Sequence, residues 1–282
     1  MSVSPSVGVS RVILAAGLAL APFMAGSEAA AQSKLEASYT ISFARIPVGS
    51  ITATSEIGNA EYITTLSGRA SGMLRVFAGG EGILATTGRV VDGRLIPLHY
   101  QSNTIADDDT LDVTMTFEDG NVKELTASAP PPAADRIAVS EGDRRGVVDP
   151  LTALLVPAAD GGDGVAEPSC QRTLAIFDGR RRFDLRLAFR RIDTVKAEQG
   201  YAGPAVVCAV TFQPIAGHRT SSPLVKFLSD GRDIEMTLAP VAGTRVLAPF
   251  RLTVTNMLGN LVVQANRFET TTRASTTTGR AR

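Results

Sequence analysis

Few residues in this sequence belong to the types that carry out catalysis. Its only histidines are His99 and His218, and neither stands in the motif that presents a nucleophilic serine. A Ser-His-Asp triad needs a nucleophile and a positioned carboxylate beside the imidazole. His99 falls within a predicted strand, and His218 falls in the turn Gly217-His218-Arg219. We therefore expect both to be ordinary surface or hydrogen-bonded histidines, and we predict no catalytic residue.

Asp149, Asp178 and Asp184 are the carboxylates considered for acid–base chemistry. Glycoside hydrolysis requires two carboxylates about 5–10 Å apart in one cleft. Asp149 precedes Pro150, as the N-cap of a helix does, and Asp178 precedes a glycine in a predicted turn. Both positions are explained without catalysis. An enzyme acting on envelope polysaccharide or lipid is therefore the alternative hypothesis, and a protein without enzymatic activity is favoured.

No metal or cofactor is predicted. The acidic run Asp107-Asp108-Asp109, followed by Asp112, lacks the alternating ligands and glycine of a calcium loop and is expected to be a solvated turn. Two histidines and two cysteines would need carboxylates to complete a zinc site. The sequence contains no phosphate-binding loop and no dinucleotide fingerprint.

Arginines are densest in residues 180–191. Arg182, Arg186 and Arg190 would share one face of a strand and form a ridge suited to phosphate or another anionic group of the cell envelope. Asp184 lies on the same face and weakens this ridge. The alternative is a solvated strand face with cross-strand ion pairs.

Cys170 and Cys208 are the only cysteines and lie 38 positions apart. If the chain enters an oxidising compartment, an even number of cysteines indicates a disulfide. Because Cys170 precedes one predicted strand and Cys208 lies within another, a Cys170–Cys208 bond between strands is expected. The alternative is two separate buried thiols.

The first thirty-one residues have the pattern of a cleavable secretory signal. Arg11 precedes an apolar stretch at residues 12–26, and the small residues Ala29-Ala30-Ala31 follow. The apolar stretch is shorter than a membrane-spanning helix and contains Pro22. Cleavage after Ala31 is predicted, which would leave an exported, soluble protein without a transmembrane anchor.

The composition argues against nucleic-acid binding. Among 282 residues, Lys+Arg and Asp+Glu both number 28, so the chain has no basic excess. Tryptophan is absent, and the aromatic residues are 11 Phe and 4 Tyr, too few for stacking on single strands.

The dominant periodicity is that of β-strands. Tyr39, Ile41 and Phe43 alternate with polar residues, as in a strand with one buried face. Residues 46–49 are predicted as the first turn, and Asp92-Gly93 and Asp119-Gly120 as hairpin turns. About a dozen strands indicate an all-β fold with an antiparallel, strongly curved sheet, barrel-like or a sandwich.

One short helix is predicted, starting at Asp149-Pro150 and ending before Pro157. Residues 226–228 are interpreted as a strand, and the prolines at 130–132 as a surface linker within a single domain. That domain would span residues 32–269. A Thr- and Arg-containing tail at residues 270–282 is predicted to be disordered.

Several segments in this order resemble the family of exported Gram-negative envelope proteins catalogued as domain of unknown function 3108. The resemblance covers residues 35–268. It departs from the family near residues 227–233, where an aromatic such as Trp is expected before Ser229-Asp230. The segments are the strand at residues 39–43 with Val48-Gly49, then Val148-Asp149-Pro150-Leu151 with Ala153-Leu154, Ile176-Phe177-Asp178-Gly179-Arg180-Arg181, Tyr201-Ala202-Gly203-Pro204-Ala205 with Cys208, and Pro214-Ile215-Ala216-Gly217.

This resemblance implies a β-rich periplasmic protein and supplies no catalytic residues. A curved sheet with alternating apolar positions can hold a lipid or another apolar ligand on its concave face. The leading hypothesis is therefore a periplasmic envelope protein that binds such a ligand without enzymatic activity. A scaffold that binds other envelope proteins is a further hypothesis.

Overall fold

The computed structural model describes Met1 and residues 31–71, 80–106, 109–129, 133–159, 164–230, 233–255 and 259–274. The helices in these residues are α2 (Pro150–Leu154) and α3 (Pro223–Ser229), with 3-10 turns η2 (Gly142–Arg144) and η3 (Glu167–Cys170). The strands are β1 (Ala31–Phe43), β2 (Ile46–Ile57), β3 (Glu61–Ala70), β4 (Glu81–Val91), β5 (Arg94–Ala106), β6 (Asp109–Glu118), β7 (Asn121–Ala127), β8 (Val156–Pro157), β9 (Arg172–Phe177), β10 (Arg182–Lys196), β11 (Gln199–Gly200), β12 (Ala202–Ala216), β13 (Ile234–Pro240), β14 (Val246–Val254) and β15 (Leu261–Ala274).

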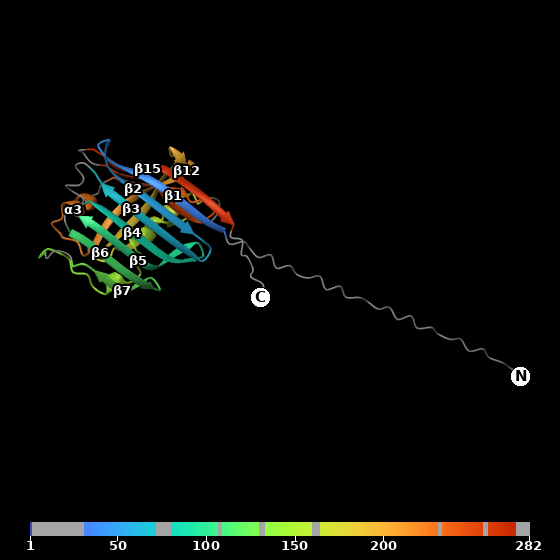
Figure 1. Ribbon diagram of the computed structural model, residues 1–282, viewed down its shortest axis with the longest axis horizontal. Helices are drawn as coiled ribbons and strands as arrows, with labels where there is room; N and C mark the ends of the chain where they lie inside the picture. Colours follow the sequence, from blue (N-terminus) through green and yellow to red (C-terminus); the bar gives the residue numbers. More distant parts are fainter. Residues whose placement is uncertain are drawn as a thin grey trace.

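The strands form one sheet made of two antiparallel meanders. The strand order is β7-β6-β5-β4-β3-β2-β1-β15-β14-β13-β12-β10-β9, with β8 paired to β14 and β11 paired in parallel to β15. The two meanders meet where β1 pairs with β15, from Ala31 opposite Ala274 to Phe43 opposite Leu261. In Figure 1, β1 and β15 lie side by side along the upper edge of the molecule.

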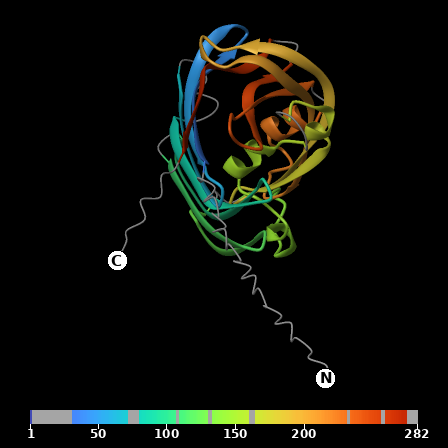
Figure 2. The same ribbon diagram turned by 90° about the vertical axis from the view of Figure 1, so that its right-hand side faces the viewer.

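The sheet curls around an interior that contains α2, as Figure 2 shows. The blue-to-green strands of the first meander face the yellow-to-red strands of the second. The edge strands β7 and β9 do not pair with each other, and the chain before α2 lies between them. There the Val147 amide donates to the Gly120 carbonyl at 2.9 Å, and the Val148 amide donates to the Ala175 carbonyl at 2.9 Å. The predicted antiparallel, strongly curved, barrel-like sheet is thus confirmed.

Two hairpin turns lie at the predicted Asp-Gly pairs, whereas the first turn of the chain does not lie where it was predicted. At Asp92-Gly93 and Asp119-Gly120 both residues have positive φ, between 50° and 76°, which suits the twist of antiparallel strands. The first turn is not at residues 46–49, as predicted, but at Ala44 and Arg45, whose φ angles are 49° and 70°. Strand pairing imposes this conformation on two residues that do not favour it, so the local sequence contains no signal for the turn.

Two further predictions were wrong. Residues 226–228 belong to helix α3 and not to a strand, because Pro223 stands at its first turn and the Ser222 side chain accepts from the Val225 amide. The described residues therefore contain two helices, where one was predicted. The predicted disordered tail begins too early, since β15 continues through residues 270–274, paired with β1. Threonine favours strands, and β1 supplies the partner.

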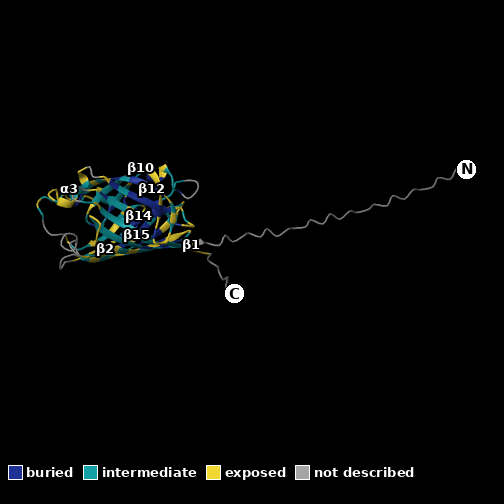
Figure 3. Ribbon diagram, turned by 90° about the horizontal axis from the view of Figure 1, so that it is seen from above, coloured by how far each residue is buried: buried dark blue, intermediate teal, exposed yellow. Residues whose placement is uncertain are grey.

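The buried side chains concentrate in the second meander, where Figure 3 shows dark blue over β12 and β14. Phe250 and Phe268 are fully buried and their ring centroids lie 5.7 Å apart.

Among the described residues, no helix combines the length and apolar character needed to span a membrane. The predicted signal at residues 1–31 lies almost wholly outside the described residues, as do Asp107, Asp108, the prolines 130–132 and residues 275–282.

The predicted disulfide is confirmed. Cys170 at the end of η3 and Cys208 in β12 are bonded, with their Cα atoms 5.5 Å apart. Both are fully buried in a cluster that includes Leu238 and Leu247. The bond therefore ties the segment before β9 to the centre of the second meander.

Replacing both cysteines, Cys170→Ala with Cys208→Ala, should lower the free energy of unfolding by about 4 kcal/mol, because the bond closes a 38-residue loop in the unfolded chain. Urea unfolding of the variant and of the oxidised and reduced wild type measures this. Reduced wild type should match the variant. A loss under about 1 kcal/mol would show that the bond contributes little to stability.

Candidate functional site

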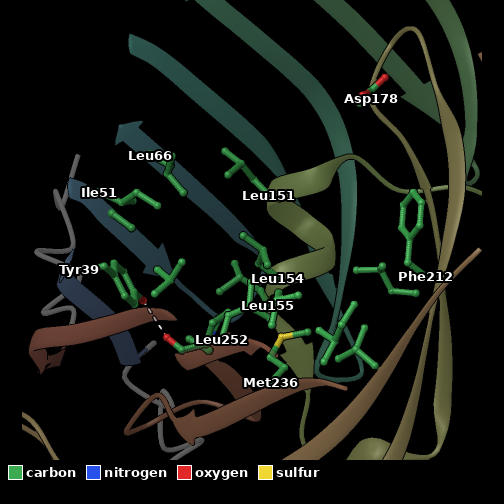
Figure 4. A pocket seen from close by; sticks show the side chains of 18 of the residues that line it. Tyr39, Ile51, Leu66, Leu151, Leu154, Leu155, Asp178, Phe212, Met236 and Leu252 are labelled. Atoms are coloured by element: carbon green, nitrogen blue, oxygen red, sulfur yellow. Dashed lines mark hydrogen bonds between the residues drawn. The ribbon is translucent and has the colours of Figure 1, made fainter. Parts of the chain in front are cut away.

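The interior of the curved sheet contains an apolar cavity of about 470 Å³. This volume lies within the range of roughly 300–1,000 Å³ usual for sites that bind small molecules. Figure 4 shows side chains from β1, β2, β3, α2, β12, β13 and β14 converging on it. Its apolar lining includes Leu35, Ile51, Ala53, Leu66, Leu151, Leu154, Leu155, Phe183, Leu185, Val210, Phe212, Met236, Leu252, Val254 and Val263.

Strand alternation explains why these side chains face inward. In β10, Phe183 and Leu185 line the cavity, whereas Arg186, between Leu185 and the buried Leu187, is exposed. The same period of two brings Tyr39 of β1 to the wall, where its hydroxyl donates to the Pro249 carbonyl at 2.8 Å. The sequence predicted this alternation, but the strand order decided which inward residues share one cavity.

Helix α2 forms one wall of the cavity and is held by a buried polar network centred on Asp149. The Asp149 carboxylate is fully buried. Its Oδ1 accepts from the Leu151 and Thr152 amides at 2.9 and 3.0 Å. Its Oδ2 accepts from the Thr152 and Thr86 hydroxyls at 2.5 and 3.0 Å. Tyr62 Oη lies 2.6 Å from Thr152 Oγ1. These bonds attach α2 to β3 and β4.

The environment of Asp149 acts on its pKa in opposite directions. Burial raises the pKa of Asp149, whereas the four hydrogen-bond donors favour the charged form and lower it; burial has the larger effect. Burial, followed by the charge of Asp149, also raises the pKa of Tyr62 well above its ordinary value. The predicted N-cap function of Asp149 is therefore confirmed.

The other two aspartates considered for catalysis also have structural partners. Asp178 Oδ1 accepts from the amides of Arg180 and Arg181, and its Oδ2 accepts from Arg181 Nε at 2.8 Å. Asp184 pairs with Arg182 at 2.5 Å. Within the described parts of the chain, no group of three or more His, Cys, Asp or Glu side chains is placed to hold a metal ion.

His218 differs from the prediction of an ordinary histidine. The residue is 5% exposed and lines the cavity, and neither ring nitrogen has a hydrogen-bond partner in the structure described. Its ring lies edge-on to Phe183 and Phe212, with centroids 6.2 and 5.8 Å away. Burial, followed by the charge of Arg181, lowers the pKa of His218, whereas the Arg182 backbone and the charge of Asp178 act in the opposite direction. The prediction of a surface histidine was wrong, and the ring makes no well-formed hydrogen bond in the structure described.

The predicted arginine ridge lies outside the cavity wall. Arg182 is half-buried and bonded to Asp184, and Arg190 pairs with Asp233 of the loop before β13. Arg186 is exposed. The Arg182–Asp184 pair lies within β10, whereas the Arg190–Asp233 pair joins β10 to the residues before β13. Anion binding by Arg182, Arg186 and Arg190 stays a prediction.

The fold and the cavity together define a class, an all-β protein whose curved sheet encloses an apolar cavity. The chain belongs to the family "Protein of unknown function (DUF3108)", whose sequence profile matches residues 38–266. No curated protein is significantly similar to the chain in sequence. A crystal structure of a β-barrel-like protein of domain of unknown function DUF1849 from Brucella abortus is similar at 11% identity and a TM-score of 0.43. The match covers 86% of this chain and 99% of that one. So weak a likeness carries no argument about function.

Asp149→Ala should lower the free energy of unfolding by about 2–4 kcal/mol, because α2 loses its N-cap and the buried hydroxyls of Thr86 and Thr152 lose their acceptor. Chemical denaturation measures the difference. Asp143→Ala is a matched control, since Asp143 accepts from the amide and hydroxyl of Ser140 near the surface. If the free energy of unfolding falls by the same small amount in both variants, the Asp149 network does not hold α2.

Asp149→Asn keeps a side chain that can cap α2 but removes the ionisable carboxyl group. Because folding raises the pKa of Asp149 above its unfolded value of 3.8, its stabilising contribution is present at low pH and is lost as pH rises through the folded-state pKa. The stability of wild type relative to Asp149→Asn should therefore increase from neutral pH down to about pH 4. Unfolding curves across this range test the direction, and an opposite slope would contradict it.

Proposed function

We propose that this chain is a periplasmic envelope protein that holds a lipid or another apolar ligand inside its curved sheet and has no enzymatic activity of its own. The observation that carries the proposal is the cavity of about 470 Å³, with its aliphatic and aromatic lining. Such a cavity offers few hydrogen bonds to water and therefore favours an apolar occupant.

The character of the lining also supports an apolar occupant. Apolar side chains from both meanders and from α2 line the cavity. Burying a hydrocarbon chain against them would remove apolar surface from water, which is favourable by about 25 cal/mol per Å².

Export to the periplasm is part of the proposal. It is supported by the signal pattern of residues 1–31 and by the Cys170–Cys208 bond, since disulfides persist in oxidising compartments. The intact mass of protein isolated from the periplasm should match a chain that begins at Gln32 and is two hydrogens lighter than the reduced form. A mass that includes Met1 would contradict export by cleavage.

Ala53→Phe places a large side chain in the cavity and should weaken binding of the apolar fluorophore N-phenyl-1-naphthylamine at least about tenfold, because the added ring occupies the ligand's space. Val263→Phe adds a large side chain to the cavity from another strand, and it replaces Ala53→Phe in the test if Ala53→Phe does not fold. Ala188→Phe is the matched control, since Ala188 is exposed on β10. Fluorescence titration measures the affinities.

Native mass spectrometry of the wild type, followed by lipid analysis of what is released, identifies the natural ligand. Wild-type protein that carries no lipid and binds no fluorophore would overturn the proposal. The proposal would also be overturned if Ala53→Phe and Val263→Phe fold and bind the fluorophore as tightly as Ala188→Phe does.

A further inference from the structure

The apolar cavity has one polar corner. Asp178, Arg181 and His218 line it together, at the ends of β9, β10 and β12. Helix α3 follows His218 in the chain and also lines the cavity, and Figure 1 places α3 at the end of the sheet away from both termini. In Figure 4, Asp178 lies across the cavity from Tyr39. A ligand extended between these points would have one end at the polar corner.

The other polar residues that line the cavity are satisfied within the protein. Tyr39 donates to the Pro249 carbonyl, Thr64 donates to Ser55, and Arg251 bonds to Gln264. His218 is the exception among the lining residues the structure describes, because neither of its nitrogens makes a well-formed hydrogen bond and the Arg182 backbone is the one polar main-chain group that acts on the ring. A buried polar group without a partner is costly, and such groups in native structures need an explanation.

Mobility of the His218 segment does not explain the missing partner, because its backbone is anchored on both sides. The Ile137 amide donates to the His218 carbonyl at 3.0 Å, and the Gly217 amide donates to the Ile137 carbonyl at 2.8 Å. Gly217 has a φ of 78°, and a Cβ there would lie 1.9 Å from the Arg180 carbonyl oxygen. The backbone of His218 is therefore fixed at the cavity wall, and its imidazole lines the space that a ligand would enter.

The charges around His218 favour an anion. Besides the Arg182 backbone, two guanidiniums, of Arg181 and Arg136, and one carboxylate, of Asp178, act on the ring. The Asp178 oxygens already accept from the Arg180 and Arg181 amides and from Arg181 Nε. Arg181 uses only Nε in that pair, and its side chain is 51% exposed, so its terminal nitrogens can donate to a ligand. Guanidinium and imidazole donors together suit a carboxylate or phosphate.

We propose that the cavity binds a single-chain amphiphile whose anionic head group, a carboxylate or a phosphate, is held by His218 and Arg181 while its hydrocarbon chain extends toward Tyr39 and Leu252. This rests on the proposed function, because it specifies the ligand class of the same cavity. A purely apolar ligand would fill the cavity but leave His218 unpaired. The polar corner therefore selects among lipids by their head group.

The test displaces N-phenyl-1-naphthylamine from the mature chain at neutral pH with hexadecanoate, hexadecyl phosphate and hexadecanol, each below the concentration at which it self-associates. At least one anion should displace the fluorophore at about tenfold lower concentration than the alcohol, the effect of one charge-assisted hydrogen bond. The anion that is preferred shows whether fatty acids or phosphorylated lipids supply the head group.

His218→Phe and Arg181→Gln should each reduce the preference for the anion over hexadecanol, measured as the ratio of the two displacement concentrations within each variant. Arg181 is exposed, so its variant tests the proposal even if His218→Phe does not fold. Arg94→Gln is the matched control, because it removes an exposed arginine in the β4–β5 hairpin that does not line the cavity.

The outcomes separate the two proposals. If the anions and the alcohol displace equally in the wild type, the head-group site is wrong while ligand binding stands. If the preference survives in both variants, the anion is bound elsewhere and the inference is overturned. If neither fluorophore nor amphiphile binds, the proposed function itself fails.

Discussion

The antiparallel pairing of β1 with β15 is the constraint on which the rest of the structure depends. Each meander alone would be an open sheet, with its apolar face uncovered and another edge exposed. Thirteen residue pairs, from Ala31 opposite Ala274 to Phe43 opposite Leu261, join the two meanders into one sheet. Twist accumulated over that many strands makes the sheet curl. The curl brings β2 and β3 opposite β10 and β12, and the cavity lies between them.

Two buried polar residues in this interior show how structural and binding groups differ. Asp149 accepts four hydrogen bonds, all from the chain itself, and these fix α2 against β3 and β4. The backbone of His218 is also held by hydrogen bonds, but neither ring nitrogen makes a well-formed hydrogen bond in the structure described. The hydrogen bonds of Asp149 are therefore all made without a ligand. In the proposed complex, the ring of His218 gains its hydrogen-bond partner when the head group of the ligand reaches the cavity wall.

Local signals predicted much of the fold because strands and caps follow from neighbouring residues. The alternation in β1 and β10, the Asp92-Gly93 turn and the Asp149-Pro150 helix start are all features of short segments. Helix α3 has the same cap-and-proline signal at Ser222-Pro223, but its short apolar sequence was interpreted as a strand. The turn at Ala44-Arg45 carries no signal, because pairing of β1 with β2 imposes its backbone.

The sequence by itself determined the strand periodicity, the N-cap at Asp149, and the even pair of cysteines that form the disulfide. The tertiary structure alone decided that β1 pairs with β15, that β15 continues to Ala274, and that His218 is buried among Phe183, Phe212 and Arg181. The physical reason is the range of the interactions. Periodicity and capping act within a few residues, whereas a cavity and its polar corner arise from strands far apart in sequence, whose register is set by pairing across the whole sheet.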